Sequence, residues 1–356
     1  MKIVIVYASA GNGHRRAAEA IHDCLKKDYP KAEASLIDIV EYTNSWFARF
    51  YSRGYSFLVV RLKALWAITY YLTNLRVFAA WFKFFSRQNC RPFINILKTQ
   101  QPDIVVSTHF FPSEVVAHLK RKREINSRLV TIMTDFSPHA LWLMKNCDDY
   151  IVALDYSRDC LIRRGIEQDT IKVLGIPIDS GFSGGRQRKA EPQELSALLI
   201  TGAFGFSLIE RAVDMLFSQI RLVVVCGNNQ GLYNNLKRKN YPSIELFGFT
   251  KEIPRLMSQV DLIITKPGGL TTSEALAMEL PMLLIGAIPG QESENARILE
   301  GLGCAIRVGN APVLAKTIAD LKAHREKLDL MRANIQKIRK PDSAAQICSY
   351  MMKDVR

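Results

Sequence analysis

The sequence has 356 residues, 48% of them hydrophobic and 9% aromatic, so it predicts a globular protein of about two domains and excludes a disordered chain. The seven cysteines are scattered and form no Cys-x-x-Cys pair, which indicates a reducing cytoplasm. The net charge of +14 directs attention to anionic partners, either nucleic acid or an anionic membrane surface.

The first predicted element is a strand from Lys2 to Ala8, followed by the turn Ser-Ala-Gly-Asn-Gly-His and a helix. Because the apolar run is short and leads straight into this turn, we interpret it as a strand and expect no signal peptide. Gly11 and Gly13 form a Gly-x-Gly after a strand, but the third glycine of a dinucleotide-binding fingerprint is missing. His14 has two interpretations: it acts chemically at the turn, or it only caps or solvates the start of the helix.

The segment from 42 to 102, which follows a second predicted strand, is basic and aromatic. It contains no Asp or Glu and nine Lys and Arg residues. In a helix with about 100° per residue, its last part places aromatic side chains on one side and basic side chains on the other. The first side includes Trp81, Phe82 and Phe85, and the second includes Arg76, Lys83 and Arg87.

We interpret this helix as a membrane-association segment that lies on an anionic surface. Basic residues interrupt every apolar stretch before the roughly 20 residues needed to span a bilayer, so we expect no transmembrane helix. Two alternatives are an ordinary core helix with a solvated basic face, and nucleic acid binding. We expect no nucleic acid partner, because a groove that follows phosphates gains little from a large apolar cluster.

Two further predicted strands, Asp103 to Thr108 and Leu129 to Thr134, end in polar residues. His109 follows the first strand, and Asp135, His139 and Trp142 follow the second. Because the carboxyl ends of parallel strands border the cleft of an α/β domain, we expect these side chains at a binding site. In the alternative interpretation, Asp135 is a helix N-cap and Trp142 is a core aromatic residue.

The sequence divides at a stretch rich in glycine and basic residues. We predict a first domain at residues 1–180, an interdomain linker at 181–195 and a second domain at 196–356. Strands alternate with helices in the second domain, which is typical of a parallel sheet with helices on both faces.

The predicted strand from Leu262 to Thr265 ends in the turn Lys-Pro-Gly-Gly, and we expect a helix to begin near Thr271. Glycines let the backbone approach a ligand, and the first amides of a helix carry a partial positive charge. The turn at Gly268 and Gly269 therefore predicts a diphosphate site. The alternative is that Thr271 and Glu274 form only a capping box.

Another predicted strand, Pro281 to Ile285, is followed by a second glycine turn and then by three polar side chains. These are Gln291, Glu292 and Asn295, which are able to bind hydroxyl groups beside the first turn. A diphosphate site next to hydroxyl-binding groups predicts a nucleotide sugar as the ligand.

These motifs carry a resemblance to a known family. Thr-Lys-Pro-Gly-Gly-x-Thr-x-x-Glu-Ala and Pro-Gly-Gln-Glu-x-x-Asn-Ala resemble the donor half of the monogalactosyldiacylglycerol synthase and processive diacylglycerol glucosyltransferase family. Ser-x-Gly-x-Gly-His and Thr-Asp-Phe-x-x-His-x-x-Trp resemble its acceptor half. The family is part of glycosyltransferase family 28 and is related to the peptidoglycan enzyme that glycosylates lipid I.

The resemblance implies an α/β GT-B fold, with two Rossmann-like domains whose parallel sheets face a central cleft. It also implies an inverting enzyme that moves a hexose from UDP-glucose or UDP-galactose to diacylglycerol or a glycosyl-diacylglycerol, making glycolipid. The expected setting is peripheral, on the cytoplasmic face of a membrane. In GT-B enzymes the last helix often returns to the first domain.

The resemblance further implies a role for individual residues of this sequence. The base is His14, because a neutral imidazole is suited to accept a hydroxyl proton, and Asp135 is the competing candidate. The implied donor-binding residues are Gly202, Gly205, Phe249, Lys266, Gly268, Gly269, Thr271, Thr272, Glu274, Gln291, Glu292 and Asn295. The implied acceptor-binding residues are Gly11, Gly13, His109, His139 and Trp142. Glu274 otherwise belongs to the capping box, and Phe249 to the core.

We expect neither a metal nor a cofactor besides the UDP-sugar substrate, because a helix N-terminus is able to carry the phosphate charge. Two alternative functions are open. One is a GT-B transferase acting on another lipid acceptor, such as a polyprenyl-linked peptidoglycan precursor; the other is a noncatalytic membrane sensor that binds a nucleotide sugar. The donor sugar and the number of sugars added stay open as well, because glucosyl- and galactosyltransferases share these motifs.

Overall fold

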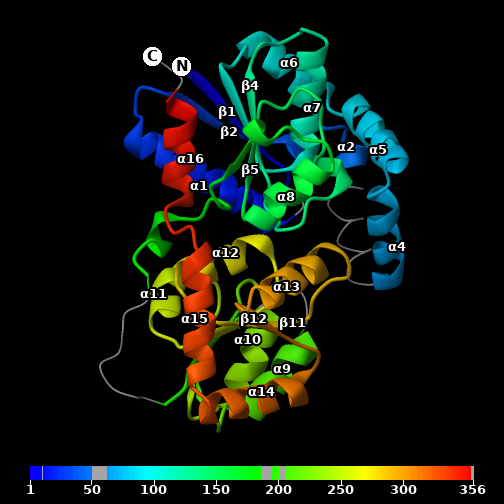
Figure 1. Ribbon diagram of the computed structural model, residues 1–356. Helices are drawn as coiled ribbons and strands as arrows, with labels where there is room; N and C mark the ends of the chain where they lie inside the picture. The colour runs from blue at the N-terminus through cyan, green and yellow to red at the C-terminus, as the bar shows by residue number, and fades with distance from the viewer. Residues whose placement is uncertain (10, 50–61, 186–193, 201–205, 354–356) are drawn as a thin grey trace. The chain divides into compact units, whose positions relative to one another are not determined.

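The computed structural model describes residues 1–9, 11–49, 62–185, 194–200 and 206–353. The chain forms two compact units, which are described separately below (Figure 1). The N-terminal unit comprises Met1–Ser180, Pro289–Gln291 and Asp342–Arg356, and the C-terminal unit comprises Gly181–Ile288 and Glu292–Pro341. Within the described part of the chain, no helix is both long enough and apolar enough to cross a bilayer.

The N-terminal unit contains a parallel sheet with the strand order β2-β1-β3-β4-β5-β6. Its strands are β1 (Lys2–Tyr7), β2 (Glu33–Asp38), β3 (Ile104–Ser107), β4 (Arg128–Ile132), β5 (Asp149–Val152) and β6 (Ile171–Val173). Successive side chains of a strand point to opposite faces, so Ile3 and Ile5 join one core and Val4 and Val6 join another. Both faces are therefore apolar, as a buried parallel sheet requires.

The helices of this unit are α1 (Asn12–Asp28), α2 (Ser45–Arg49), α4 (Lys63–Thr73), α5 (Arg76–Gln88), α6 (Arg91–Gln100), α7 (Phe110–Arg121), α8 (Asp155–Arg163) and α16 (Ser343–Met352). Some of them cover the two faces of the sheet. Apolar residues of α1 and α16 pack in the core that contains Ile3, and residues of α6 and α7 pack in the core that contains Val4.

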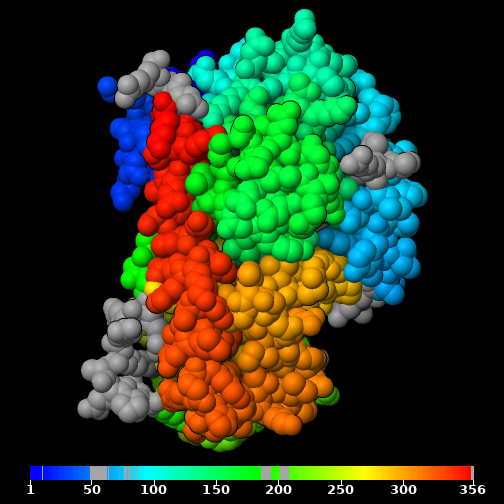
Figure 2. All heavy atoms as spheres, in the orientation of Figure 1, coloured from blue at the N-terminus to red at the C-terminus, as the bar shows by residue number. Residues whose placement is uncertain are grey.

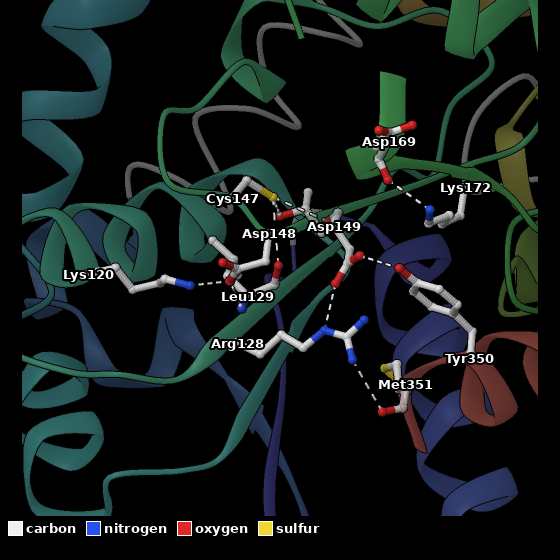
Figure 3. A network of polar contacts seen from close by, with 11 residues as sticks. Lys120, Arg128, Leu129, Cys147, Asp148, Asp149, Asp169, Lys172, Tyr350 and Met351 are labelled. Carbon is white, nitrogen blue, oxygen red and sulfur yellow. Dashed lines mark hydrogen bonds and ion pairs between the residues drawn. The ribbon is translucent and has the colours of Figure 1, made fainter. Parts of the chain in front are cut away.

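Figure 2 shows the atoms of the last helix, α16, in red against the rest of the N-terminal unit. Polar contacts also bind this helix to the unit (Figure 3). Arg128 on β4 donates through Nε to Asp149 Oδ2 at 2.7 Å, and Tyr350 donates its hydroxyl to the other oxygen of Asp149. At the start of α16, Ser343 Oγ donates to the Ile176 carbonyl at 2.8 Å. A buried carboxylate is thus shared between the sheet and the helix, which satisfies its charge.

The C-terminal unit contains a second parallel sheet, with the strand order β12-β11-β10-β7-β8-β9. Its strands are β7 (Ser196–Ile200), β8 (Arg221–Val225), β9 (Ile244–Phe247), β10 (Leu262–Thr265), β11 (Met282–Ile285) and β12 (Ala305–Val308). The helices that alternate with them are α9 (Phe206–Leu216), α10 (Gln230–Lys239), α11 (Ile253–Ser258), α12 (Gly269–Ala277), α13 (Gln291–Gly301), α14 (Ala311–Ala323) and α15 (Glu326–Ile338). The predicted strands therefore all form, with ends that shift by a residue or two.

Candidate active site

Polar residues meet in the N-terminal unit where three neighbouring strands end. His14 lies in the first turn of α1 after β1, Thr108 follows β3, and Thr134 and Asp135 follow β4. Because β1, β3 and β4 are adjacent and parallel, their carboxyl ends lie side by side at one edge of the sheet. This edge is where α/β domains bind ligands, so the topology brings these residues to a candidate site.

The ring of His14 is held by the turns after β3 and β4. Its Nδ1 lies 2.8 Å from the Thr108 carbonyl oxygen and 2.9 Å from Thr134 Oγ1. The Thr108 hydroxyl also donates to the His14 carbonyl at 2.9 Å. The N-cap of α1 is Gly11, and no side chain caps this helix, so the alternative role of His14 as a cap does not apply.

Burial lowers the pKa of His14 to about 4, although its hydrogen bond to the Thr108 carbonyl opposes this shift. The imidazole is therefore neutral near pH 7. A carbonyl oxygen only accepts hydrogen bonds, so Nδ1 carries the proton and Nε2 holds the lone pair. This tautomer is the one that a general base needs at Nε2.

His109 packs against His14 with the ring centroids 4.5 Å apart and the rings nearly perpendicular. It caps α7, since its Nδ1 accepts a hydrogen bond from the Phe111 amide at 3.1 Å. Burial, with a further contribution from His14, lowers the pKa of His109 well below its ordinary value. The predicted acceptor-binding residue is thus a neutral, buried neighbour of His14.

The three predicted site residues after β4, Asp135, His139 and Trp142, occupy different environments. Asp135 is buried and is not a helix N-cap, because the next helical turn, η3 (Ala140–Trp142), is capped by His139. Both nitrogens of His139 are used internally: Nδ1 accepts from the Leu141 amide at 3.2 Å, and Nε2 donates to the Tyr70 carbonyl of α4 at 2.9 Å. Trp142 lies in the core against Phe110. His139 and Trp142 therefore form part of the frame of this loop.

The glycine turn at the start of α1 is open. Gly11 is exposed, with an extended backbone, and a Cβ at this position would meet no atom within 4 Å. Gly13 lies in the first turn of α1. Among the residues of the N-terminal unit that the structure describes, none packs closely enough to require glycine at position 11.

In the C-terminal unit, the predicted diphosphate turn joins β10 to α12. The helix begins at Gly269, earlier than expected, and its N-cap is Gly268 with no side-chain cap. The alternative capping box of Thr271 and Glu274 is therefore wrong, because both residues already lie inside the helix. The Thr272 hydroxyl instead donates to the Gly268 carbonyl at 2.8 Å. The first three amides of α12 belong to Gly269, Leu270 and Thr271, which have no carbonyl of a preceding turn to bind.

Two of the predicted hydroxyl-binding residues hold the loops around this turn. Asn295, fully buried in α13, donates through Nδ2 to the Pro267 carbonyl at 3.1 Å. Glu292 accepts from the Ile288 amide at 2.8 Å, and its burial raises the pKa of its carboxyl, an effect that Lys266 opposes. Both residues thus fix the backbone that a diphosphate would approach. Gln291 is the first residue of α13, and Glu274 is buried in α12.

The remaining donor-side predictions have mixed outcomes. Phe249 follows β9 and is 71% exposed, so it is not the core residue of the alternative interpretation. Gly202 and Gly205 lie outside the described residues. Among the residues that are described, no group of three or more His, Cys, Asp and Glu side chains is arranged to hold a metal ion.

The predicted membrane helix, α5, has the opposite orientation from the one we expected for its basic side. Lys83 and Arg87 point inward and pair with Glu114 of α7, at 3.5 and 2.7 Å. Lys83 also donates to the Leu143 carbonyl. A buried carboxylate needs such partners, so these two cations are unavailable to lipid headgroups. The side chains of Arg76 and Phe82 are not among those described.

Apolar side chains occupy the exposed side instead. Trp81 is 66% exposed and stacks on Phe85, which packs against the core. The exposed set continues along α4 and α5, and we name it the apolar stripe: Leu65, Ile68, Leu72, Leu75, Phe78, Trp81 and Phe84. Such a run of exposed large apolar residues marks an interaction surface.

Sequence analysis missed three residues that organise these features: Thr108, Thr134 and Glu114. The signal for the threonines was available, because each directly precedes a predicted site residue at a strand end. No local signal indicated that Glu114 would pair with α5, because the partners lie 27 and 31 residues apart.

Comparison with known proteins agrees with this architecture. Residues 14–178 match the family model of monogalactosyldiacylglycerol (MGDG) synthase, and residues 198–347 match that of the glycosyltransferase family 28 C-terminal domain. The chain is 28% identical to the processive diacylglycerol beta-glucosyltransferase of Bacillus subtilis, over 99% of this chain and 95% of the relative. It is 29% identical to the protein of the same name from Bacillus licheniformis, over 99% and 94%.

Solved structures show the same fold at lower identity. Acinetobacter baumannii MurG superposes with a TM-score of 0.61 and 14% identity, over 99% of each chain. The spinosyn rhamnosyltransferase SpnG, complexed with thymidine diphosphate, superposes with a TM-score of 0.63 and 13% identity, over 99% of this chain and 100% of that one. The fold is that of the GT-B glycosyltransferases, which confirms the predicted fold. The family model of the second half and the names of the relatives identify the class of enzyme as a UDP-sugar glycosyltransferase. The matches to both halves of the chain confirm its resemblance to the monogalactosyldiacylglycerol synthase and processive diacylglycerol glucosyltransferase family, which the motifs indicated.

Proposed function

We propose that this enzyme moves a hexose from UDP-glucose or UDP-galactose to diacylglycerol or a glycosyl-diacylglycerol, with inversion at the anomeric carbon. Two family models, one for each half of the chain, support this activity, as do relatives named processive diacylglycerol beta-glucosyltransferase that match nearly the full length. The observation that carries the proposal is the neutral His14, which presents Nε2 as a base.

In the proposed reaction, His14 Nε2 takes the proton of the acceptor hydroxyl as its oxygen bonds to the anomeric carbon. The bond from that carbon to the diphosphate breaks, and UDP leaves with the electron pair. His14 is preferred over Asp135 because its tautomer is already fixed by the Thr108 carbonyl. In this proposal Asp135, which is buried, lies near the acceptor and is not the base.

The donor diphosphate is proposed to lie at the N-terminus of α12. The amides of Gly269, Leu270 and Thr271 are oriented along the helix axis, and their partial positive charge stabilises the leaving group. Lys266 adds a nearby cation. We propose that this charge replaces a metal ion, so that activity survives a chelator.

The acceptor is a lipid, and we propose that the apolar stripe is the surface that meets the membrane. Burial of one large apolar side chain contributes about 1.5 to 3 kcal/mol. Trp81→Ser should therefore weaken binding to vesicles by roughly 10- to 100-fold, measured by co-sedimentation. Leu330→Ser is the matched control, because Leu330 is equally exposed, at 65%, but lies on α15 outside the stripe. Equal loss in both variants would contradict the proposal.

The deciding experiment offers radiolabelled UDP-glucose and UDP-galactose separately to the purified protein, with vesicles that contain diacylglycerol, with and without a chelator. A labelled glycolipid is the expected product, and the number of bands on a chromatogram gives the number of sugars added. Labelling of a polyprenyl-linked lipid, but not of diacylglycerol, would show that the acceptor is the polyprenyl-linked lipid. UDP binding without any hexose transfer would support the alternative function, a noncatalytic sensor that binds a nucleotide sugar.

A further inference from the structure

We propose that Thr134 is a positioning residue for His14: its hydroxyl oxygen and the Thr108 carbonyl oxygen both accept a hydrogen bond from the Nδ1–H group and stabilise the imidazolium that forms during transfer. This proposal rests on the proposed function, since it deepens the role of the same base. It assigns to two threonines the task that a carboxylate performs beside the histidine of many hydrolases.

The geometry singles out one nitrogen of the ring. The Thr108 carbonyl oxygen and Thr134 Oγ1 lie 2.8 and 2.9 Å from the same Nδ1, and they come from the turns after two adjacent strands. Both threonines are buried, so little water competes for the contact. Among the contacts that the structure describes at Nδ1, both partners are neutral oxygens.

The proton on Nδ1 decides how Thr134 acts. Since the Thr108 carbonyl only accepts, Nδ1 is protonated and has no lone pair for the Thr134 hydroxyl. Thr134 Oγ1 therefore acts as a second acceptor of a shared N–H. Hydrogen bonds strengthen when the donor becomes charged, so both oxygens bind the imidazolium more tightly than the neutral ring.

The proton balance of the step is simple. The acceptor hydroxyl proton moves to His14 Nε2 while the glycosidic bond forms and UDP leaves. The Nδ1 proton stays in place throughout, and Thr134 remains neutral. The proton on Nε2 is later released to solvent.

The described groups around the His14 ring are neutral, so neutral oxygens must stabilise the imidazolium. His109, the N-cap of α7, lies against the ring, and burial lowers its pKa so that it is neutral; its Nδ1 accepts from the Phe111 amide. No described ion pair includes His14. A stabilising acceptor at Nδ1 therefore adds to the basicity of Nε2 without adding a charge that would need its own partner.

The test compares Thr134→Val with Thr134→Ser, and uses Thr131→Val as the matched control. Thr131 lies on β4, three residues before Thr134, and is also buried, but its hydroxyl donates to Ser113 Oγ and not to His14. Thr134→Val should lower kcat by roughly 3- to 30-fold, the range expected for the loss of one acceptor to a charged group, with KM for the UDP-sugar unchanged. Thr134→Ser should restore kcat, and Thr131→Val should leave it near the wild-type value.

The pH profile separates positioning from packing. Thr134→Val should move the acid limb of kcat/KM to lower pH, because the imidazolium loses an acceptor. A fall in kcat with an unmoved acid limb, or an equal fall in Thr131→Val, would overturn the proposal. Wild-type kcat in Thr134→Val would overturn it too.

A second readout does not depend on turnover. Nitrogen-15 NMR of histidine-labelled protein, with the His14 signals identified by their loss in His14→Asn, should show a proton on Nδ1 and a lone pair on Nε2. Thr134→Val should lower the pKa of His14 in the same spectra. The opposite tautomer, or an unchanged pKa, would overturn the positioning role. Absence of hexose transfer by the wild type would instead refute the proposed function.

Discussion

The two sheets differ in the chemical groups that they present at the carboxyl ends of their strands. In the N-terminal unit the strand ends carry side chains that bind one another, with His14 held by Thr108 and Thr134. In the C-terminal unit the end of β10 presents backbone amides, because α12 begins at Gly269 and its N-cap, Gly268, has no side chain. Proton transfer needs a titratable side chain, whereas a diphosphate is bound well by amides. The difference therefore separates the two tasks of the proposed reaction.

The comparison predicts how each edge responds to substitution. A site made of side chains should lose rate when a side chain is removed. A site made of backbone should lose affinity when a Cβ is added in the path of the ligand.

The largest effect should come from His14→Ala. Loss of a general base lowers kcat by about 10²- to 10⁴-fold, while UDP affinity, which we assign to the other edge, should stay unchanged. Turnover of labelled glycolipid and equilibrium binding of UDP measure the two quantities separately. Full turnover in the variant would transfer the role of base to Asp135.

A smaller effect is expected from Gly268→Ala. Gly268 has φ of −74°, and a Cβ there meets no protein atom within 4 Å, so the melting temperature should not change. A diphosphate at the helix N-terminus would meet that Cβ, so KM for the UDP-sugar should rise by about tenfold or more.

Gly309→Ala is the matched control for this variant. Gly309 joins β12 to α14 in the same sheet, and a Cβ there also meets no atom within 4 Å. Its KM should equal that of the wild type. An unchanged KM in Gly268→Ala would mean that the diphosphate does not bind at this turn.

The smallest effect concerns pH and stability. The pKa of His14 is about 4 in the folded protein and about 6.5 when unfolded, so the unfolded chain binds more protons between these values. Stability should therefore fall as the pH drops below 6.5, by roughly 2 kcal/mol at pH 5 from this residue. His14→Asn should show a weaker loss of melting temperature between pH 7 and 5; an identical loss in both proteins would contradict the lowered pKa of His14 in the folded protein.

The sequence was sufficient to predict the strands and the glycine turns. Runs such as Leu262 to Thr265 are buried on both faces, and glycine turns punctuate them, so local pattern and tertiary position agree. The strand ends also led us to predict ligand-binding roles for His14 and for the turn at Gly268.

Contacts between distant segments could not be predicted in this way. His14 and Thr108 are 94 residues apart, and only the order of β1, β3 and β4 brings them together. The predicted orientation of α5 was wrong for the same reason. Helical periodicity separated Trp81 from Lys83 and Arg87, but the pairing with Glu114 of α7 decided that the two cations face inward. The start of α12 was misplaced because a glycine N-cap gives no side-chain signal.

The attachment of α16 has a consequence for biosynthesis. Ile347 and Met351 of this helix fill the same core as Ile3 on the first strand, so that core is incomplete until the ribosome has translated the last helix. About 160 residues separate the end of the first N-terminal stretch from α16, which at roughly 5–20 residues per second takes on the order of 10–30 seconds. For that interval α1 covers this sheet face without α16, so the nascent chain exposes apolar surface of the kind that promotes aggregation and that chaperones bind.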